Sequence, residues 1–335
     1  MAVDLAVIWA MIIAFAVAMY VVMDGFDLGI GILFPKFKVG LERDTAMNSI
    51  APVWDGNETW LVLGGGGLMA AFPLAYAVIL PALYAPLIAM LLGLVLRGVA
   101  FEFRWRDPAH RPIWDAAFFT GSLVATLAQG ITLGALLQGI AVEGRAYAGG
   151  WWDWFTPFSL LTGVSLVIAY ALLGACWLIW KTEGPLQKQM FHYARPLGIA
   201  FVLAIGAVSL ATPFLEGQYW QRWFAYPGII VTAPVPFLMA VAILVFARAL
   251  MKKQERTPFF SALAIFGMCL VGLGVSIWPD VVPGRITIWQ AAAPDESLGF
   301  MLVGALVMVP IILAYTAWSY WVFRGKVGEE GYHEH

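Results

Sequence analysis

Residues 5–34 read LAVIWAMIIAFAVAMYVVMDGFDLGIGILF and form a nearly continuous apolar run. A helix needs about 20 apolar residues to cross the roughly 30 Å hydrocarbon core of a bilayer. The run exceeds that length and carries only two charged residues, Asp24 and Asp27. It shows no strand-like alternation, and a backbone exposed to lipid must satisfy its own hydrogen bonds. We therefore expect a transmembrane α-helix.

Eight further apolar segments of the same kind follow in the chain. The nine predicted spans are 5–34, 51–73, 75–101, 113–140, 158–180, 196–214, 229–250, 259–279 and 299–323. The links between them are short and leave no room for a soluble catalytic domain. We expect an all-α integral membrane protein in which residues 1–335 form a single transmembrane domain.

The basic residues orient these spans. Sixteen of the 19 Lys and Arg residues fall in odd-numbered links, near the span ends that adjoin them (Arg97 and Arg248), or after the last span, and only Arg145, Arg222 and Arg285 fall in even-numbered links. Cytoplasmic loops of membrane proteins collect positive charge. The pattern therefore predicts an outside N-terminus, a cytoplasmic C-terminus and nine spans.

The composition indicates the same class of protein. Mean hydropathy is +0.82, with 61% hydrophobic and 12% charged residues, which is typical of an integral membrane protein. The net charge of −2 gives no indication of a nucleic-acid partner. Cys176 and Cys269 lie inside apolar segments, so we interpret them as small buried hydrophobic residues rather than a disulfide or zinc site.

Two pairs of acids are the first candidate functional residues. Asp24 and Asp27 lie near the end of the first span, and Asp55 and Glu58 lie at the start of the second. Each pair has i, i+3 spacing, which places both carboxylates on one helix face. Acids inside a membrane often form proton relays, and close pairs share protons. The alternative for Asp55 and Glu58 is electrostatic stabilisation of a helix N-terminus.

Glycines and one Arg/Glu pair surround these acids in the sequence. Gly25 and Gly29 form a small-xxx-small pair in the first span, and residues 64–67 are four successive glycines. We interpret both as close-packing surfaces, with the first as a candidate contact for a partner subunit; the alternative for residues 64–67 is a locally unwound segment. Arg97 and Glu102 flank the inner end of the third predicted span, where they either pair within the protein or snorkel to the interface.

The histidines indicate where haem is not expected. His110, His192, His333 and His335 all fall in predicted cytoplasmic links or in the tail, and none falls in a predicted span. Membrane haems are usually held by histidines that project from spans. We therefore expect no haem or metal ligands in this chain.

Two motifs identify a family. The stretches Asp24-Gly25-Phe26-Asp27-Leu28-Gly29-Ile30-Gly31 and Asn48-Ser49-Ile50-Ala51-Pro52-Val53-Trp54-Asp55-Gly56-Asn57-Glu58-Thr59-Trp60 closely resemble subunit II of the cytochrome bd-type quinol oxidases. Further matches are 101–104, 137–139 and 310–318, so the resemblance covers essentially the whole chain. The compact link between the sixth and seventh spans is similar to that of the cyanide-insensitive oxidase subgroup.

The resemblance implies a fold and a partner. Subunit II is expected to consist of two four-helix bundles plus one extra helix and to bind no haem. Subunit I is expected to hold two b-type haems and a d-type, or substituted b-type, haem. Together they would oxidise membrane quinol and reduce oxygen to water in the bacterial cytoplasmic (inner) membrane, with proton uptake from the cytoplasm contributing to the proton-motive force. A small third subunit, bound lipid and a structural quinone are further family features that the resemblance leaves open here.

The resemblance also implies roles for two residues. It places Asp55 on a proton pathway toward subunit I, which we extend to Glu58, Asp24 and Asp27. Trp60 matches a tryptophan near an oxygen-channel entrance in some members; without the resemblance, Trp60 would indicate ordinary interface packing. Nothing in the motifs assigns a catalytic residue to this chain.

Two other classes of protein share some of these features. A secondary transporter also has many spans, glycine-rich helices and acidic pairs, but it should place polar residues near the midplane in both halves of the chain. A non-catalytic scaffold should tolerate neutralisation of Asp55 and Glu58. The motifs favour the oxidase subunit over both.

Overall fold

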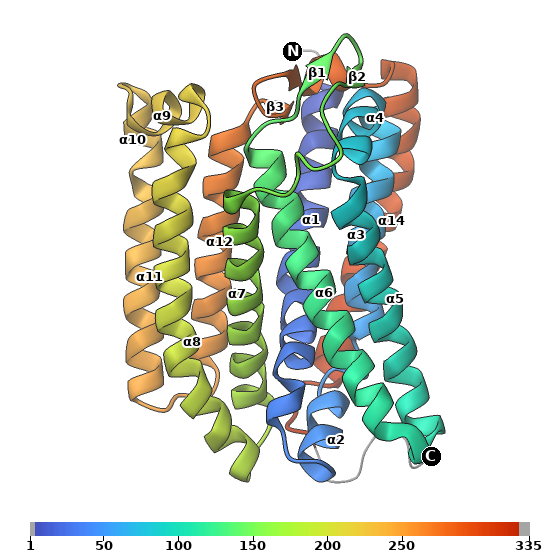
Figure 1. Cartoon of the computed structure of the whole chain (residues 1–335), viewed down its shortest axis with the longest axis vertical. Coiled ribbons are helices and arrows are strands. Elements are labelled where there is room, and N and C mark those ends of the chain that lie inside the picture. Colours follow the sequence, from blue (N-terminus) through green and yellow to red (C-terminus); the bar gives the residue numbers. More distant parts are fainter. Residues whose placement is uncertain (1–3, 328–335) are drawn as a thin grey trace.

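The computed structural model describes residues 4–327 as a long helical bundle (Figure 1). The long helices are α1 (Leu5–Leu33), α3 (Trp54–Ala71), α5 (Tyr84–Arg106), α6 (Arg111–Leu137), α7 (Pro157–Lys181), α8 (Gly184–Ala211), α11 (Pro234–Met251), α12 (Thr257–Ile277) and α14 (Asp295–Val322). Within the described residues, eight helices are singly long and apolar enough to span a membrane. A ninth candidate span is α3 together with the bent helix that follows it. Hydropathy predicted nine segments, and the described residues give eight spans, or nine if the bent pair counts as one.

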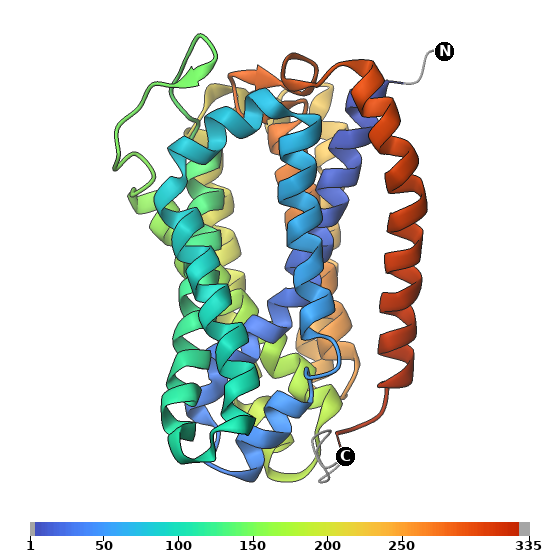
Figure 2. The ribbon, with the colours of Figure 1, turned by 90° about the vertical axis from the view of Figure 1, so that its right-hand side faces the viewer.

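Short elements close the two ends of the bundle. One end carries α4 (Pro73–Ala82), α9 (Gly217–Phe224), α10 (Gly228–Thr232), α13 (Ile288–Ala291) and two antiparallel hairpins, β1–β2 (Val142–Glu143 with Ala146–Tyr147) and β3–β4 (Asp280–Val282 with Ile286–Thr287). The other end carries α2 (Leu41–Asn48) and the links that hold most of the basic residues. We call these the hairpin end and the basic end. Helix α1 begins at the hairpin end and α14 finishes at the basic end (Figure 2).

The third predicted span, 75–101, is wrong in its first third. Residues 73–82 form α4, which is bent by 119° from α3 and crosses the hairpin end to reach α5 (Figure 2). Pro73 disfavours a helical conformation at Phe72, whose φ and ψ are −128° and 62°. The segment is apolar because Ala75, Val78 and Ile79 are buried in the core cluster at the hairpin end, which includes Ile286 and Ile288. The apolar sequence therefore continues across a break between two helices, and the predicted span included parts of both.

The sixth span begins earlier than predicted. Helix α8 starts at Gly184, so His192 lies on a candidate spanning helix rather than in a link. Its side chain is exposed. His110 lies in a short 3-10 turn, and His333 and His335 are outside the described residues.

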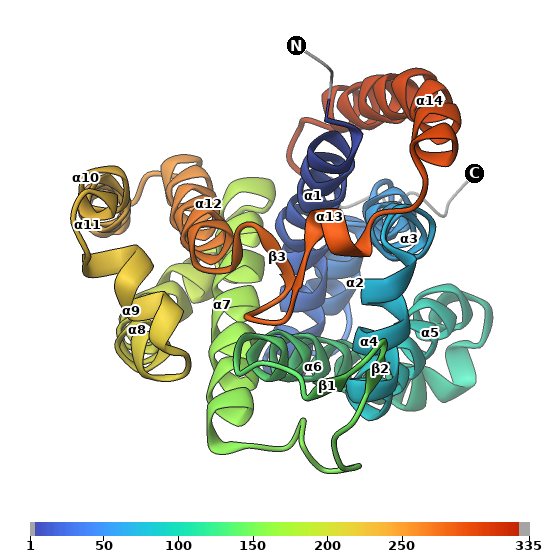
Figure 3. The same ribbon diagram turned by 90° about the horizontal axis from the view of Figure 1, so that it is seen from above.

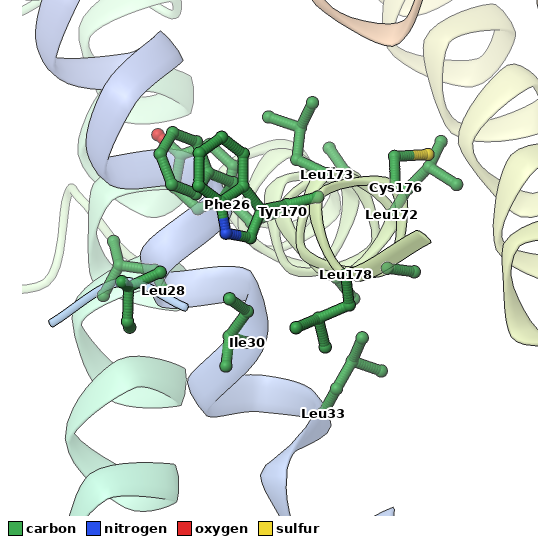
Figure 4. Close-up of a cluster of buried hydrophobic side chains, with 14 of the residues drawn as sticks. Phe26, Leu28, Ile30, Leu33, Tyr170, Leu172, Leu173, Cys176 and Leu178 are labelled. Carbon is green, nitrogen blue, oxygen red and sulfur yellow. The ribbon is translucent and has the colours of Figure 1, made fainter. Parts of the chain in front are cut away.

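Glycines on α1 bring it against α7 at the centre of the bundle. A Cβ on Gly29 would lie 1.8 Å from the carbonyl oxygen of Tyr170, and a Cβ on Gly174 would lie 2.5 Å from the carbonyl carbon of Gly29. Gly25 faces the ring of Tyr170. Figure 4 shows Phe26, Leu28, Ile30 and Leu33 of α1 beside the buried residues of α7. The glycine surface is therefore a packing surface, as expected, but α7 of the same chain covers it, so its assignment to a partner subunit was wrong.

The four glycines 64–67 are fully helical within α3. Gly64 faces Val17 and Gly67 faces Ile13, both on α1, whereas Gly65 and Gly66 meet nothing within 4 Å. One side of this glycine run packs within the chain, and the other side is open.

Helix α14 lies at the edge of the bundle (Figure 3). It packs against α1 and α3, and most of its side chains are exposed. The membrane sidedness and the division into two four-helix bundles plus one extra helix stay predictions.

Candidate functional site

A buried arginine lies at the meeting point of α1, α3 and α5. The side chain of Arg97 on α5 is fully buried. Its Nη1 donates a hydrogen bond of 2.6 Å to Oδ1 of Asp24 on α1, and it lies 3.1 Å from Oε1 of Glu58 on α3. The ring of Trp54 faces the guanidinium at 6.0 Å. Arg97 therefore forms a buried ion pair and does not snorkel, and Glu102 instead lies 3.8 Å from Arg106 on the surface.

Close helix packing holds Arg97 in this position. A Cβ on Gly93 would lie 2.8 Å from the backbone nitrogen of Ala125, and a Cβ on Gly121 would lie 2.7 Å from the backbone nitrogen of Arg97. Helices α5 and α6 consequently approach with no side chain between them at this level. Asp24 lies nine residues before the end of α1, roughly 14 Å along the axis at 1.5 Å per residue. The site is inside the bundle rather than at its surface.

The second acid of the first pair has neutral partners. Asn57 donates through Nδ2 to Oδ2 of Asp27 at 2.7 Å and to the carbonyl oxygen of Met23 at 3.3 Å. Tyr320 of α14 donates to Oδ1 of Asn57 at 3.0 Å. Asp27 and Asn57 are buried. This group joins α1, α3 and α14.

A tyrosine pair extends the polar region one turn from Asp24. Gln129 of α6 donates through Nε2 to the hydroxyl of Tyr20 at 2.6 Å, and Tyr170 of α7 donates to Oε1 of Gln129 at 3.1 Å. Helices α1, α6 and α7 therefore contribute these polar groups to the interior beside Asp24.

Several atoms of this region have no hydrogen-bond partner among the described residues. They are Oδ2 of Asp24, Oδ1 of Asp27, Nε and Nη2 of Arg97, and the hydroxyls of Ser122 and Thr126 on α6. Buried polar atoms normally pair with protein or ordered water. The concentration of unsatisfied donors and acceptors marks this region as the polar interior of an otherwise apolar bundle.

The structure brings some of the predicted site residues together and leaves others apart. Asp24 and Glu58 share Arg97, and Asp27 lies on the same face of α1 as Asp24. Asp55, one turn before Glu58 on α3, is exposed, and the ion pairs of Arg97 do not include it. Trp60 is 1% exposed and packs edge-on against Phe15 at 5.7 Å.

A second buried network, at the basic end, was missed by the sequence analysis. Arg104 of α5 pairs with Asp115 of α6 at 2.5 Å and with Asp44 of α2 at 2.7 Å, and Arg43 also reaches Asp115 at 2.6 Å. Alternating charge in the neighbouring links is too weak a pattern to predict these partners. Among the described residues, no group of three or more His, Cys, Asp or Glu side chains is placed to hold a metal ion.

The fold and this interior define a multi-pass helical membrane protein with a buried ion-pair cluster. Residues 5–323 match the family model of the cytochrome bd terminal oxidase subunit II, and the chain belongs to that family. It is therefore a subunit of a quinol oxidase complex and a multi-pass protein of the bacterial inner membrane.

Individual relatives agree with the family. A probable cytochrome oxidase subunit 2 of Haemophilus influenzae is 33% identical, over 95% of this chain and 94% of the relative. The cytochrome bd-I ubiquinol oxidase subunit 2 of Escherichia coli K12 is 31% identical, over 96% and 95%. The bd oxidase structure from Geobacillus thermodenitrificans shares the fold, with a TM-score of 0.81, 16% identity, and coverage of 95% of this chain and 98% of that one.

Proposed function

We propose that this chain is the haem-free subunit II of a bd-type oxidase, and that it supports subunit I and delivers protons to it. The complex would oxidise membrane quinol and reduce oxygen to water, with protons taken up from the cytoplasm. The buried arrangement of Arg97 with Asp24 and Glu58 is the observation that carries this proposal. A purely mechanical subunit has no need of ionisable groups inside the membrane, which are costly and commonly functional.

The charges of the cluster suit proton exchange. Three carboxylates, Asp24, Asp27 and Glu58, lie near one guanidinium, which stays protonated. Like charges in a low-dielectric site do not all ionise together, so such carboxylates share protons. Arg97 would hold Asp24 and Glu58 in position while a proton moves among the acids.

Asp55 connects the cluster to an open stripe on α3. Asp55, Thr59, Val62, Gly66 and Met69 recur at i, i+4, i+7, i+11 and i+14, and all are exposed. An exposed carboxylate at the head of a membrane helix is costly in lipid, and an exposed glycine allows a second helix to approach closely. We place subunit I against this stripe, with Glu58 lying between Asp55 and the buried Arg97.

The positions of the histidines favour haem binding in the partner. His110 and His192 are exposed near the basic end and do not face the bundle interior. We therefore assign the two b-type haems and the d-type or substituted b-type haem to subunit I. The outside N-terminus, the cytoplasmic C-terminus, the oxygen-channel role of Trp60, the structural quinone, bound lipid and a small third subunit stay expectations of the family resemblance.

Neutral variants in the purified two-subunit complex test the proposal. We expect Asp24→Asn and Glu58→Gln to slow quinol-dependent oxygen uptake by at least tenfold while the haem spectrum and subunit ratio stay normal, since a general proton-transfer group contributes about 10²–10⁴-fold. Glu102→Gln is the matched control, because this carboxylate is 54% exposed on α5. Full oxygen uptake in both cluster variants would favour the scaffold interpretation, and a haem-free preparation without uptake would favour a transporter.

A further inference from the structure

A polar cavity lies at the basic end, where α7 and α14 finish beside the link from α2 to α3. Its volume is about 170 Å³, and it is lined by Asn48, Ser49, Lys181, Lys326 and the chain that follows α14. Asn48 and Ser49 open the second of the two family motifs, yet neither takes part in the ion-pair cluster. A smaller hollow of about 70 Å³ shares Ser49 and Lys181 and adds Arg324.

Lys181 carries a charge that has no acidic partner in the described part of the chain. The residue is only 5% exposed. Its Nζ donates to the carbonyl oxygen of Phe323 at 2.5 Å and lies 5.4 Å from the ring centre of Trp177. Among residues 4–327, no carboxylate lies within 4.0 Å of it. A buried cation is costly unless it is paired, and one carbonyl oxygen uses only one of its three donors.

Lys326, on the opposite wall, is already paired. Its Nζ lies 2.9 Å from Oε2 of Glu255 and donates to the carbonyl oxygen of Thr182 at 2.9 Å. The hydrogen bond from Lys326 lowers the pKa of Glu255, so this carboxylate stays ionised at neutral pH. The unbalanced charge of the cavity is therefore that of Lys181, with Arg324 nearby.

We propose that this cavity binds the phosphate of a membrane phospholipid headgroup. Helices α7 and α14 are both apolar enough to span a bilayer, so a cavity at their common end lies at headgroup depth. The volume holds several waters or one phosphate group. A phosphate ester would supply the missing negative charge to Lys181 and would join the tail after α14 to the end of α7. Free inorganic phosphate shares this chemistry, but its source is the cytoplasm rather than the bilayer.

Native mass spectrometry of the intact complex, purified in mild detergent and phosphate-free buffer, tests the site. We expect the wild type to retain one phospholipid more per complex than Lys181→Met. Lys188→Met is the matched control, because Lys188 is an exposed lysine on α8 near the same end, and Lys181→Arg should keep the lipid. Equal lipid retention in Lys181→Met and the wild type, with a normal haem spectrum, would overturn the proposal.

Two further experiments distinguish a phospholipid from free phosphate and from an acidic side chain as the partner of Lys181. Excess inorganic phosphate should leave the lipid adduct in place, whereas replacement of the lipid by a phosphate adduct would overturn the bilayer as the source. Glu329 and Glu330, which lie outside the described residues, are an alternative source of negative charge for Lys181. We expect E329Q/E330Q to retain the wild-type lipid count, and a gain of one lipid in that variant would show that the acidic tail, not lipid, balances Lys181.

Discussion

Arg97 is the residue on which the interior of this subunit depends. Its ion pair with Asp24 has no access to solvent on either side, so each charge is tolerated only because the other is present. Replacing both members of such a pair with apolar groups can leave the free energy of unfolding unchanged. Removal of one member, by contrast, leaves a buried charge without a partner.

Arg97→Met should therefore destabilise the complex strongly. Breaking a buried pair costs about 3–5 kcal/mol, and thermal unfolding of the purified complex would measure the loss. The double variant R97M/D24N should recover part of it, because the uncompensated carboxylate is gone. Arg106→Met is the control: its side chain is 77% exposed and pairs with Glu102 at 3.8 Å, so a change of less than about 1 kcal/mol is expected. Equal losses in the two single variants would contradict a special role for Arg97.

At the scale of single residues, sequence spacing predicted part of the site. The i, i+3 spacing of Asp24 and Asp27 correctly places both on the buried face of α1. The second pair differs in exposure: Asp55, in the first turn of α3, is exposed, whereas Glu58 lies 3.1 Å from Arg97. Arg97 lies about forty residues beyond Glu58 in the sequence, and no local pattern chooses between pairing and snorkelling. That choice depends on the approach of α5 to α6 through Gly93 and Gly121.

Among the elements, the contact of α1 with α7 positions the acids. At the crossing Gly29 of α1 faces Gly174 of α7. Neither residue has a side chain, so the two backbones meet directly. Small residues at helix crossings are the usual means of close packing in membranes. The sequence predicted close packing by the glycines, whereas the identity of the partner helix depends on tertiary structure.

Gly29→Ala should force α1 and α7 apart, because its Cβ would overlap the carbonyl oxygen of Tyr170. Overpacking of this kind costs about 1–3 kcal/mol, and we expect a lower unfolding temperature of the complex. Gly206→Ala on α8 is the matched control: no atom lies within 4 Å of its Cβ position, and alanine favours a helix over glycine by up to about 1 kcal/mol. A Gly29→Ala complex as stable as the wild type would show that the crossing can relax.

The bend between α3 and α4 shows the limit of hydropathy at this scale. Apolar residues in α4 are buried under a hairpin and not in lipid, yet the two environments select the same side chains. The many-span helical architecture could be predicted, whereas the boundaries of the third span could not.

For the whole molecule, the exposed stripe on α3 is where the subunit would join its partner. Gly66→Leu adds a side chain where nothing in this chain lies within 4 Å, so the fold of the subunit should tolerate it. We expect the variant to lose most of subunit I during purification, because a partner helix can no longer approach α3. Gly206→Leu on α8 provides the control. Normal recovery of subunit I with Gly66→Leu would place the interface elsewhere.

Proton uptake by the fully reduced complex after an oxygen pulse, followed with a pH-indicating dye, measures proton delivery by this subunit. We expect Asp24→Asn and Glu58→Gln to slow uptake from the side of the basic end by at least tenfold, with Glu102→Gln unchanged and the haem content intact. Uptake at the wild-type rate in both cluster variants would contradict a role for this subunit in proton delivery.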